Sequence, residues 1–323
     1  MKAVIINSYG DADVFQIQDI SKTKISIDEV LIEVKSGSVT SGEARIRAIN
    51  VPEGMSFFVR LMFGFKKPKY SILGSEFSGI ITETGADVTE FNVGDKVFGY
   101  SSKSGANAEF MKIKADNVIV KMSNNMSFED AASIPFGFGA AHYFLTKAGV
   151  KSGDKVLING ASGSVGTAAV QLAKIFGAEV TGISTKKNHE LISTLGADFV
   201  IDYKSEDFTK LEKKYDVILD TIGKLNFSDS KDSLVEKGKF VQMVGGLPFY
   251  LRMFISNIFN SKKIVSGVSN DTKEKLDYLK DLYERKMIKP VISKIYSLDE
   301  IVRAHEYVDS GHKIGNVVLK ISE

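Results

Sequence analysis

The spacing of hydrophobic and polar positions changes about one third of the way along the chain. Before residue 126, short runs of β-branched and aromatic residues are separated by glycine-containing turns, a pattern typical of strands. The strands predicted in this part are Met1–Ile6, Glu29–Ser36, Ser78–Thr84, Asp95–Tyr100 and Ala108–Ile113. Several short strands with frequent turns predict a partly closed β-barrel or a curved sheet.

From about Ser127 helical and strand patterns alternate. The predicted helices are Phe128–Lys147, Val165–Phe176, Asn188–Leu195 and Ser228–Val235. The predicted strands are Lys155–Asn159, Glu179–Ser184, Phe199–Ile201, Asp216–Asp220 and Lys239–Val244. Apolar strands joined by helical crossovers are typical of a parallel sheet that is covered on both faces, so this part of the chain predicts a doubly wound α/β domain.

The last segment predicts helices at Thr272–Arg285 and Leu298–Asp309 and a closing strand at Gly315–Ile321. We assign this segment to the first domain. The predicted organisation is therefore a domain of residues 1–125 and 265–323 and a second domain of residues 126–264. A chain of 323 residues suits two domains, since one domain usually has about 100 to 200 residues.

The composition restricts the kinds of covalent and metal-binding site that the chain can form. The chain has no cysteine, which excludes disulfides, cysteine nucleophiles and thiolate-bound zinc. Its four histidines are scattered, so we expect no metal. A formal net charge of +2 gives no reason to expect a nucleic-acid partner. With no signal-like start and no apolar run of about 18 residues, we expect a cytoplasmic protein without a transmembrane segment.

The strongest local motif follows the predicted strand 155–159. A glycine-containing loop there opens a helix, which is the context of a dinucleotide-binding fingerprint. The candidate phosphate-binding residues are Ala161, Ser162, Gly163, Ser164, Val165 and Gly166. A plain turn between a strand and a helix is the alternative, but the complete strand, loop, helix and strand unit favours phosphate binding.

The type of cofactor depends on the end of the next strand. NAD-binding domains carry an acid about 20 residues beyond the glycines, and this chain has Ser184, Lys186 and Lys187 in that region instead. Hydroxyl and ammonium groups pair with a 2′-phosphate, so the sequence predicts NADPH. Tyr203 is a candidate for the adenosine end. The alternatives are that the two lysines are solvated turn residues and that Tyr203 is a packing residue.

Several segments together carry a family resemblance. Residues 74–79 (GSEFSG), 94–99 (GDKVFG), 131–135 (AASIP) and 215–223 occur in the order seen in medium-chain dehydrogenases/reductases, which the chain resembles over nearly its whole length. The resemblance implies a GroES-like partly closed β-barrel catalytic domain and a Rossmann nucleotide-binding domain. It also implies a homodimer.

The zinc ligands of the family's alcohol dehydrogenases have no counterpart here. Thr40, Ser75 and the segment around Gly137 occupy the matching places, and the four-cysteine structural lobe is missing. The chain is therefore most similar to the zinc-free quinone oxidoreductases and alkenal/enone reductases. This implies NADPH-dependent reduction of a small hydrophobic carbonyl or quinone. Two departures from that branch are Thr40, where an Asn is common, and Ala140, where a Thr is frequent.

Family position also implies the residues near the nicotinamide. Thr40, Glu43 and Tyr100 are the catalytic candidates. The cofactor candidates are Asn316 and, at an expected strand end within residues 244–247, Val244, Gly245 and Gly246. The alternatives are that Thr40 caps a turn, that Glu43 pairs with Arg45 or Arg47, and that Tyr100 is barrel packing.

Two aromatic stretches, residues 55–65 and 247–255, are open to three interpretations. They wall a pocket for a hydrophobic substrate, they are buried in the core or a dimer interface, or they rest on a membrane surface. For the whole chain, the alternatives to a quinone or enone reductase are a metal-free alcohol/carbonyl oxidoreductase and an NADPH-binding regulatory or structural module with little turnover.

Overall fold

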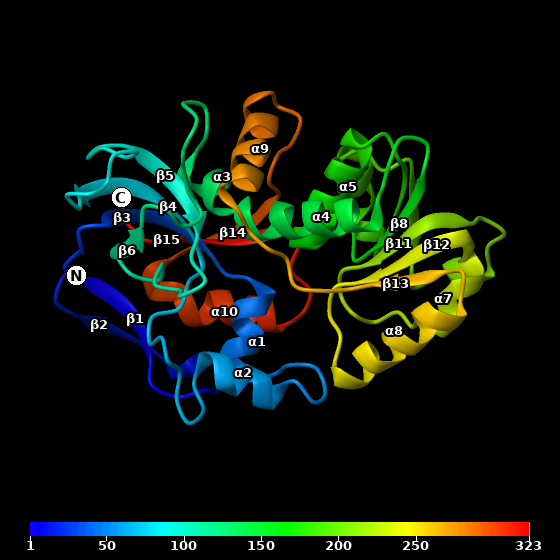
Figure 1. The fold of residues 1–323 in the computed structure, drawn as a ribbon, viewed down its shortest axis with the longest axis horizontal. Helices are drawn as coiled ribbons and strands as arrows, with labels where there is room; N and C mark the ends of the chain where they lie inside the picture. The colour runs from blue at the N-terminus through cyan, green and yellow to red at the C-terminus, as the bar shows by residue number, and fades with distance from the viewer. Residues whose placement is uncertain (323) are drawn as a thin grey trace. The chain divides into compact units, whose positions relative to one another are not determined.

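The computed structural model describes residues 1–322, which form two compact units (Figure 1). Unit 1 contains residues 1–51, 56–136 and the chain from 271 onward, and unit 2 contains residues 52–55 and 137–270. The predicted domains change at 125/126 and 264/265, whereas the units change at 136/137 and 270/271.

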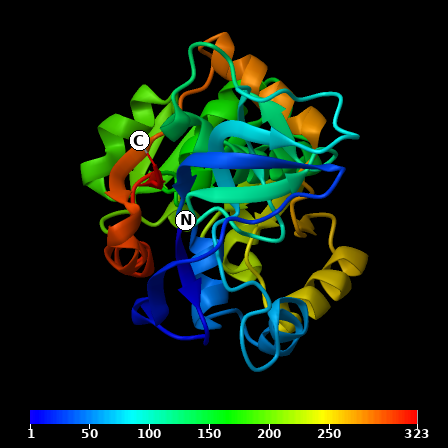
Figure 2. The same cartoon turned by 90° about the vertical axis from the view of Figure 1, so that its left-hand side faces the viewer.

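Unit 1 is built on a seven-stranded sheet (Figure 2). Its strands, in spatial order, are β14 (Ile292–Ser297), β15 (Asn316–Lys320), β3 (Glu29–Ser38), β4 (Glu76–Thr84), β5 (Lys96–Tyr100) and β7 (Ile119–Lys121), with β6 (Phe110–Lys114) also paired to β3. Only β14 and β15 are parallel neighbours within this sheet. A separate hairpin joins β1 (Lys2–Ile6) and β2 (Phe15–Asp19).

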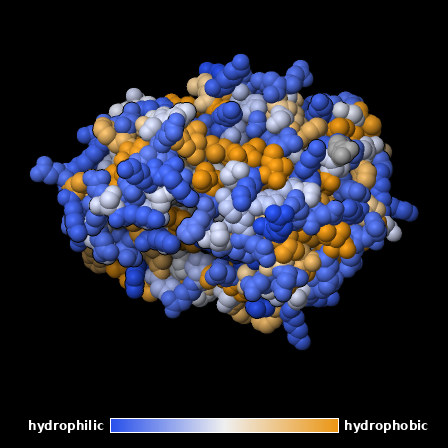
Figure 3. Space-filling model, turned by 180° about the vertical axis from the view of Figure 1, so that it is seen from behind, coloured by the Kyte–Doolittle hydropathy of each residue, from blue (hydrophilic) through white to orange (hydrophobic). Residues whose placement is uncertain are grey.

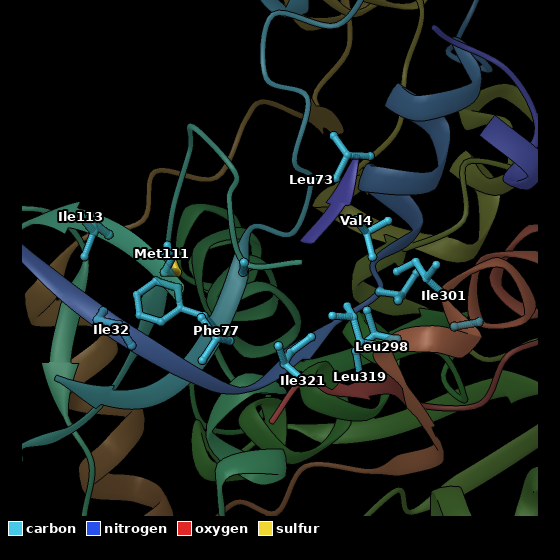
Figure 4. Packing of buried hydrophobic residues seen from close by; sticks show 14 of the residues in the cluster. Val4, Ile32, Leu73, Phe77, Met111, Ile113, Leu298, Ile301, Leu319 and Ile321 are labelled. Atoms are coloured by element: carbon cyan, nitrogen blue, oxygen red, sulfur yellow. The ribbon is translucent and has the colours of Figure 1, made fainter. Parts of the chain in front are cut away.

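The C-terminal segment completes this unit. Strand β15 pairs antiparallel with β3, with Val318 opposite Ser38 and Lys320 opposite Ser36. Helix α10 (Ile301–Asp309) contacts α1 (Ser41–Ala48). Figure 4 shows how side chains from distant parts of the sequence meet in the core of unit 1. The labelled residues are Val4, Ile32, Leu73, Phe77, Met111, Ile113, Leu298, Ile301, Leu319 and Ile321.

Unit 2 contains a six-stranded sheet in which every pairing is parallel. Its order is β10 (Phe199–Asp202), β9 (Glu179–Ser184), β8 (Lys155–Asn159), β11 (Tyr215–Asp220), β12 (Leu234–Gln242) and β13 (Lys263–Val265). The helices that follow its strands include α5 (Ser164–Ile175), α6 (His189–Thr194), α7 (Phe227–Ser230) and α8 (Leu247–Phe259). The strand order reverses at β8, and such a switch point is where open α/β sheets bind ligands.

Some predicted elements were wrong in extent. The single helix Phe128–Lys147 is two helices, α3 (Phe128–Ala132) and α4 (Pro135–Ala148), because Pro135 lacks an N–H and suits only the start of a helix. The predicted helix Ser228–Val235 ends early, and buried Leu234 begins strand β12. That strand ends at Gln242 rather than Val244.

Other elements were not predicted. Strands β7 and β13 have three residues each, too few to show a period. Helices α2 (Ser56–Phe63) and α8 are apolar and have no buried residue, so they lack the contrast between two faces that marks an amphipathic helix. Helix α1 and strands β2 and β14 were also not predicted. Helix α9 (Lys273–Glu284) begins and ends one residue inside its predicted range. No helix within residues 1–322 is long and apolar enough to cross a bilayer.

Candidate functional site

The turn after β8 is held in a single shape by backbone hydrogen bonds. Gly160 has φ +80°, and a Cβ there would lie 2.6 Å from Thr221 Oγ1. The Ala161 N–H donates to the Ile183 carbonyl (3.1 Å), and the Gly163 N–H donates to the Gly160 carbonyl (3.0 Å). The loop therefore delivers the chain directly into α5.

Two glycines of this loop have different physical roles. A Cβ on Gly166 would lie 2.1 Å from the Gly160 carbonyl oxygen, so only glycine lets α5 start so close to the loop. A Cβ on Gly163 would meet nothing nearer than 3.5 Å. The space beside Gly163 is open, as expected for a position that a ligand approaches.

The start of α5 has no side-chain cap. Gly163 is the N-cap and has no side chain, so it leaves the amides of the first turn without a side-chain cap. The first turn carries no acidic residue. The helix dipole and these amides together favour a bound anion such as a pyrophosphate.

Ser184, which was predicted for the 2′-phosphate, lies beside Ser162 of the predicted phosphate-binding loop. Ser184 Oγ donates to Ser162 Oγ (2.9 Å), and Asn188 Nδ2 donates to Ser184 Oγ (3.0 Å). Lys186 and Lys187 occupy the turn after β9 and are exposed. The ion pairs within residues 1–322 include neither lysine. Tyr203 joins this group, since its N–H donates to the Ser184 carbonyl (3.4 Å) and its side chain is exposed.

Asp202 is a residue near this group that sequence reasoning missed. It ends β10, where it lies opposite Ser184 in the sheet register. Its carboxylate accepts a hydrogen bond from the Lys204 N–H (3.0 Å). A search for an acid after the second strand overlooks it because it belongs to the neighbouring strand.

Asp220 shapes the loop beside the glycine turn. It is fully buried and accepts hydrogen bonds from the backbone of Ile222 (3.1 Å), Gly223 (3.1 Å) and Leu225 (2.8 Å) and from Asn159 Nδ2 (3.0 Å). Asp220 belongs to the family motif at residues 215–223, but its role could not be predicted from that motif. Its role is to hold the loop after β11 against the end of β8.

Residues 244–247 are not a strand end, contrary to our expectation, because β12 stops at Gln242 and α8 begins at Leu247. Val244 nevertheless lies beside the Asp220 loop, since a Cβ on Gly223 would meet Val244 Cβ at 3.0 Å. Gln242 Nε2 donates to the Val244 carbonyl (2.8 Å) and fixes the bend. Gly245 leads on to Gly246, which is the N-cap of α8.

In unit 1, Thr40 caps a helix. Its Oγ1 accepts a hydrogen bond from the Glu43 N–H (3.1 Å) at the start of α1, and the side chain is buried. The capping alternative is therefore what the structure shows. The hydroxyl can still donate its own hydrogen, because the cap uses only an acceptor lone pair.

Glu43 is buried among neutral donors. Its Oε1 accepts from the Gly74 N–H and from Asn107 Nδ2, both at 3.1 Å. No ion pair joins it to Arg45 or Arg47 within residues 1–322, and Arg47 instead pairs with Asp309 (Nη2 to Oδ2, 2.6 Å). Desolvation is the main cause that raises the pKa of Glu43 to about 7.

Glu76, which sequence reasoning did not propose for the site, is the second buried carboxyl of unit 1. It accepts from Ser38 Oγ and from the Phe136 N–H. Burial raises its pKa to about 7. Burial likewise lowers the pKa of Lys313 to about 8, an effect that the charge of Glu76 opposes. The only sequence signal for Glu76 was its place in the 74–79 motif.

Tyr100 lies directly opposite Glu76 in the pairing of β4 with β5. Burial, together with the charges of Asp271, Glu76 and Glu43, raises the pKa of Tyr100 to about 12. The phenol therefore keeps its proton at neutral pH and can act as a hydrogen-bond donor.

Asn316 belongs to unit 1, at the start of β15. Its backbone N–H and its Nδ2 both donate to the Val291 carbonyl, at 2.7 and 3.1 Å. Its part in cofactor binding stays a prediction.

Comparison with known proteins gives the family. The model of the alcohol dehydrogenase GroES-like domain matches residues 26–124, and that of zinc-binding dehydrogenase matches residues 195–319. Acryloyl-coenzyme A reductase of Sulfurisphaera tokodaii is 30% identical, with 99% of this chain and 100% of the relative covered. The chain belongs to the medium-chain dehydrogenase/reductase superfamily.

Solved structures agree with this assignment. The quinone oxidoreductase from Coxiella burnetii has a TM-score of 0.90 and 31% identity, over 100% of this chain and 99% of that one. The Escherichia coli quinone oxidoreductase complexed with NADPH has a TM-score of 0.85 and 25% identity, over 99% and 100%. The predicted fold class, a GroES-like domain with a Rossmann domain, is confirmed, and so is the quinone and alkenal reductase branch.

The zinc-binding name of one family model does not describe this medium-chain reductase, whose sequence has no cysteine. Within residues 1–322, no group of three or more His, Asp or Glu side chains is arranged to hold a metal ion. Ser75 stands next to Glu76 where the family's zinc enzymes have a histidine ligand. The polar groups described above in unit 1 are the Glu43 and Glu76 carboxyls, the Tyr100 phenol and the Thr40 hydroxyl.

The open space beside Gly163 allows the predicted phosphate site to be tested by a substitution. Gly163→Ala adds a methyl group that no protein atom opposes, so we expect a loss of unfolding free energy below about 1 kcal/mol. The methyl group would displace a bound pyrophosphate, so the Kd for NADPH should rise about tenfold or more. Gly166→Ala is the contrast, because it should destabilise the fold itself. An unchanged Kd in Gly163→Ala would show that the cofactor does not bind at this loop.

The raised pKa of Glu43 predicts how stability changes with pH. Because the pKa rises from 4.5 to about 7 on folding, the folded state holds this proton more tightly. The resulting stabilisation is complete below the unfolded pKa and is lost as the pH rises through about 7. Its size is a few kcal/mol, since one pKa unit corresponds to about 1.4 kcal/mol.

Glu43→Gln replaces the carboxyl with a neutral group of the same shape. Urea unfolding across this pH range should show a smaller loss of stability in the variant than in the wild type. Glu76 titrates in the same range in both proteins, so the difference between them isolates Glu43. Identical pH slopes would contradict a buried, protonated Glu43.

Proposed function

We propose that this protein is an NADPH-dependent reductase that transfers hydride to quinones or α,β-unsaturated carbonyls without zinc. The observation that carries the proposal is the glycine turn at 160–166, whose open space at Gly163 and uncapped amides suit a dinucleotide pyrophosphate. The relatives support the reaction class. They include 2-methylene-furan-3-one reductase of Solanum lycopersicum, 29% identical over 99% of this chain and 79% of the relative.

The residues present fit the phosphorylated cofactor. The amides of Ser164, Val165 and Gly166 would hold the pyrophosphate, and Ser184, Lys186 and Lys187 would hold the 2′-phosphate. In this proposal Tyr203 covers the adenosine end, and Val244, Gly245, Gly246 and Asn316 serve the nicotinamide end. The bound cofactor supplies the hydride, which the protein's own side chains cannot provide.

Hydride transfer to the substrate requires stabilisation of the negative charge that develops. Addition to the β-carbon of an enone places negative charge on the carbonyl oxygen, and a proton must then reach the α-carbon. Donors aimed at that oxygen lower the barrier. In unit 1 we propose the Tyr100 phenol and the Thr40 hydroxyl as donors, and Glu43 as a group that stores a proton near neutral pH.

The first experiment follows the oxidation of NADPH by absorbance, with a chelator present. We expect turnover with a quinone or a short enone, little with a simple ketone, and slower turnover with NADH. Turnover of the ketone alone would favour the alcohol/carbonyl oxidoreductase. Tight NADPH binding with no turnover would overturn the reductase proposal in favour of a binding module.

The choice of NADPH over NADH has its own test. Lys186→Glu with Lys187→Glu places negative charge where the 2′-phosphate is expected, so the KM for NADPH should rise about tenfold or more while the KM for NADH changes little. Lys237→Glu, at an exposed lysine of strand β12, is the matched control. Equal effects on both cofactors would show that the lysines do not read the phosphate. In that case Asp202 would be the next residue to test.

We also propose that the protein is a cytoplasmic homodimer with a small hydrophobic carbonyl or quinone substrate and no nucleic-acid partner. The mass measured by light scattering tests the dimer, and a monomeric mass would contradict it.

A further inference from the structure

Helix α8 in unit 2 presents an apolar face that is exposed in the described part of the chain, residues 1–322. Six of its thirteen residues are large, apolar and exposed: Leu247, Leu251, Phe254, Ile255, Ile258 and Phe259. Leu251, Phe254 and Ile258 follow the spacing of one helix face, and Phe254 is 66% exposed. Phe249 and Met253 point the other way and pack against the core of unit 2. The helix is therefore anchored along one side and bare along the other.

Helix α2 repeats these features in unit 1. Phe57, Phe58, Leu61 and Met62 are exposed, as is Phe65 just after the helix. None of the helix's residues is buried. An exposed apolar patch usually marks a binding surface, because it costs free energy to keep it in water. On the molecular face shown in Figure 3, hydrophobic patches lie among hydrophilic residues.

The sequence segments that contain the two helices carry only positive charges, and acidic residues (Glu53, Glu76, Glu236 and Asp271) lie directly beyond their ends. Residues 237–270 contain five lysines and arginines and no acid, and residues 54–75 contain four and no acid. Setting these nine charges aside turns the chain's net +2 into −7 for the rest of the protein. None of the nine appears among the ion pairs of residues 1–322. Residues 131–153 also lack acids, but much of that segment is buried in α4, whereas α8 and α2 are exposed.

These features point to one kind of partner. We propose that α8 of unit 2 and α2 of unit 1 each bind the surface of a lipid bilayer that contains anionic phospholipids. Apolar side chains on such helices enter the boundary between headgroups and acyl chains, and flanking cations bind the phosphates. Neither helix can cross the bilayer, so each lies on the surface. Contact of either helix with the same helix of a second copy is disfavoured, because it would bring positive charges together.

The test is co-sedimentation of the full chain with vesicles. We expect binding to vesicles of phosphatidylcholine mixed with phosphatidylglycerol, about tenfold weaker binding to phosphatidylcholine alone, and weaker binding at high salt. Leu251→Ser with Phe254→Ser should reduce binding to the mixed vesicles by about tenfold or more. Phe57→Ser with Leu61→Ser tests α2 in the same way.

Ile27→Ser with Val93→Ser is the matched control, since both residues are 63% exposed and lie outside the two segments. This control should bind vesicles like the wild type. All variants should keep the wild-type Kd for NADPH, which separates this proposal from the reductase proposal. Three results would overturn it: no binding to the mixed vesicles, undiminished binding by the α8 variant, or a fall from dimer to monomer in that variant without lipid.

Discussion

The close approach of α5 to the Gly160 carbonyl is the contact on which the cofactor site depends. With 2.1 Å between that oxygen and a Cβ on residue 166, any side chain there would push the helix away from β8. The helix would then no longer present its first amides at the edge of the sheet. The other features of the site follow from this placement, because the Asp220 loop and the Ser162 to Ser184 hydrogen bond are built around the same turn.

In unit 1 the main physical constraint is the free-energy cost of burying charge. Glu43 and Glu76 are both buried and accept hydrogen bonds from neutral donors, and the charges of Arg47 and Lys313 offset only part of the effect of burial. The cheaper state is then the protonated one, which is why both pKa values rise to about 7. His305, 3.8 Å from Glu43, is held neutral by burial, which lowers its pKa to about 3. Unit 1 thus holds two carboxyls whose pKa values lie near neutral pH.

The sequence predicted the nucleotide-binding unit better than the rest. The bounds of β8 and β9 match the prediction because each strand has a buried centre, 156–158 in β8 and 180–183 in β9, and ends at a polar or glycine turn. The candidate phosphate-binding residues 161–166 could be proposed from the sequence because the spacing of their glycines reflects the geometry of the turn. The roles of Asp220 and Glu76 were missed because a buried acid has no periodic signal, and its partners are backbone groups from distant segments. Thr40 shows the reverse case, in which family position suggested catalysis and the structure shows a helix cap as well. The exposed face of α8 could not be predicted from the sequence, because an apolar run favours burial and only the structure shows which of its side chains are exposed.

The central claim is direct hydride transfer from a nicotinamide to an activated alkene without a metal. The most direct measurement uses NADPH deuterated at the transferable position, a short enone and a chelator, with the product analysed by NMR. Our account predicts deuterium at the β-carbon and a solvent proton at the α-carbon. Product without deuterium at the β-carbon, or no product although the cofactor binds, would contradict it.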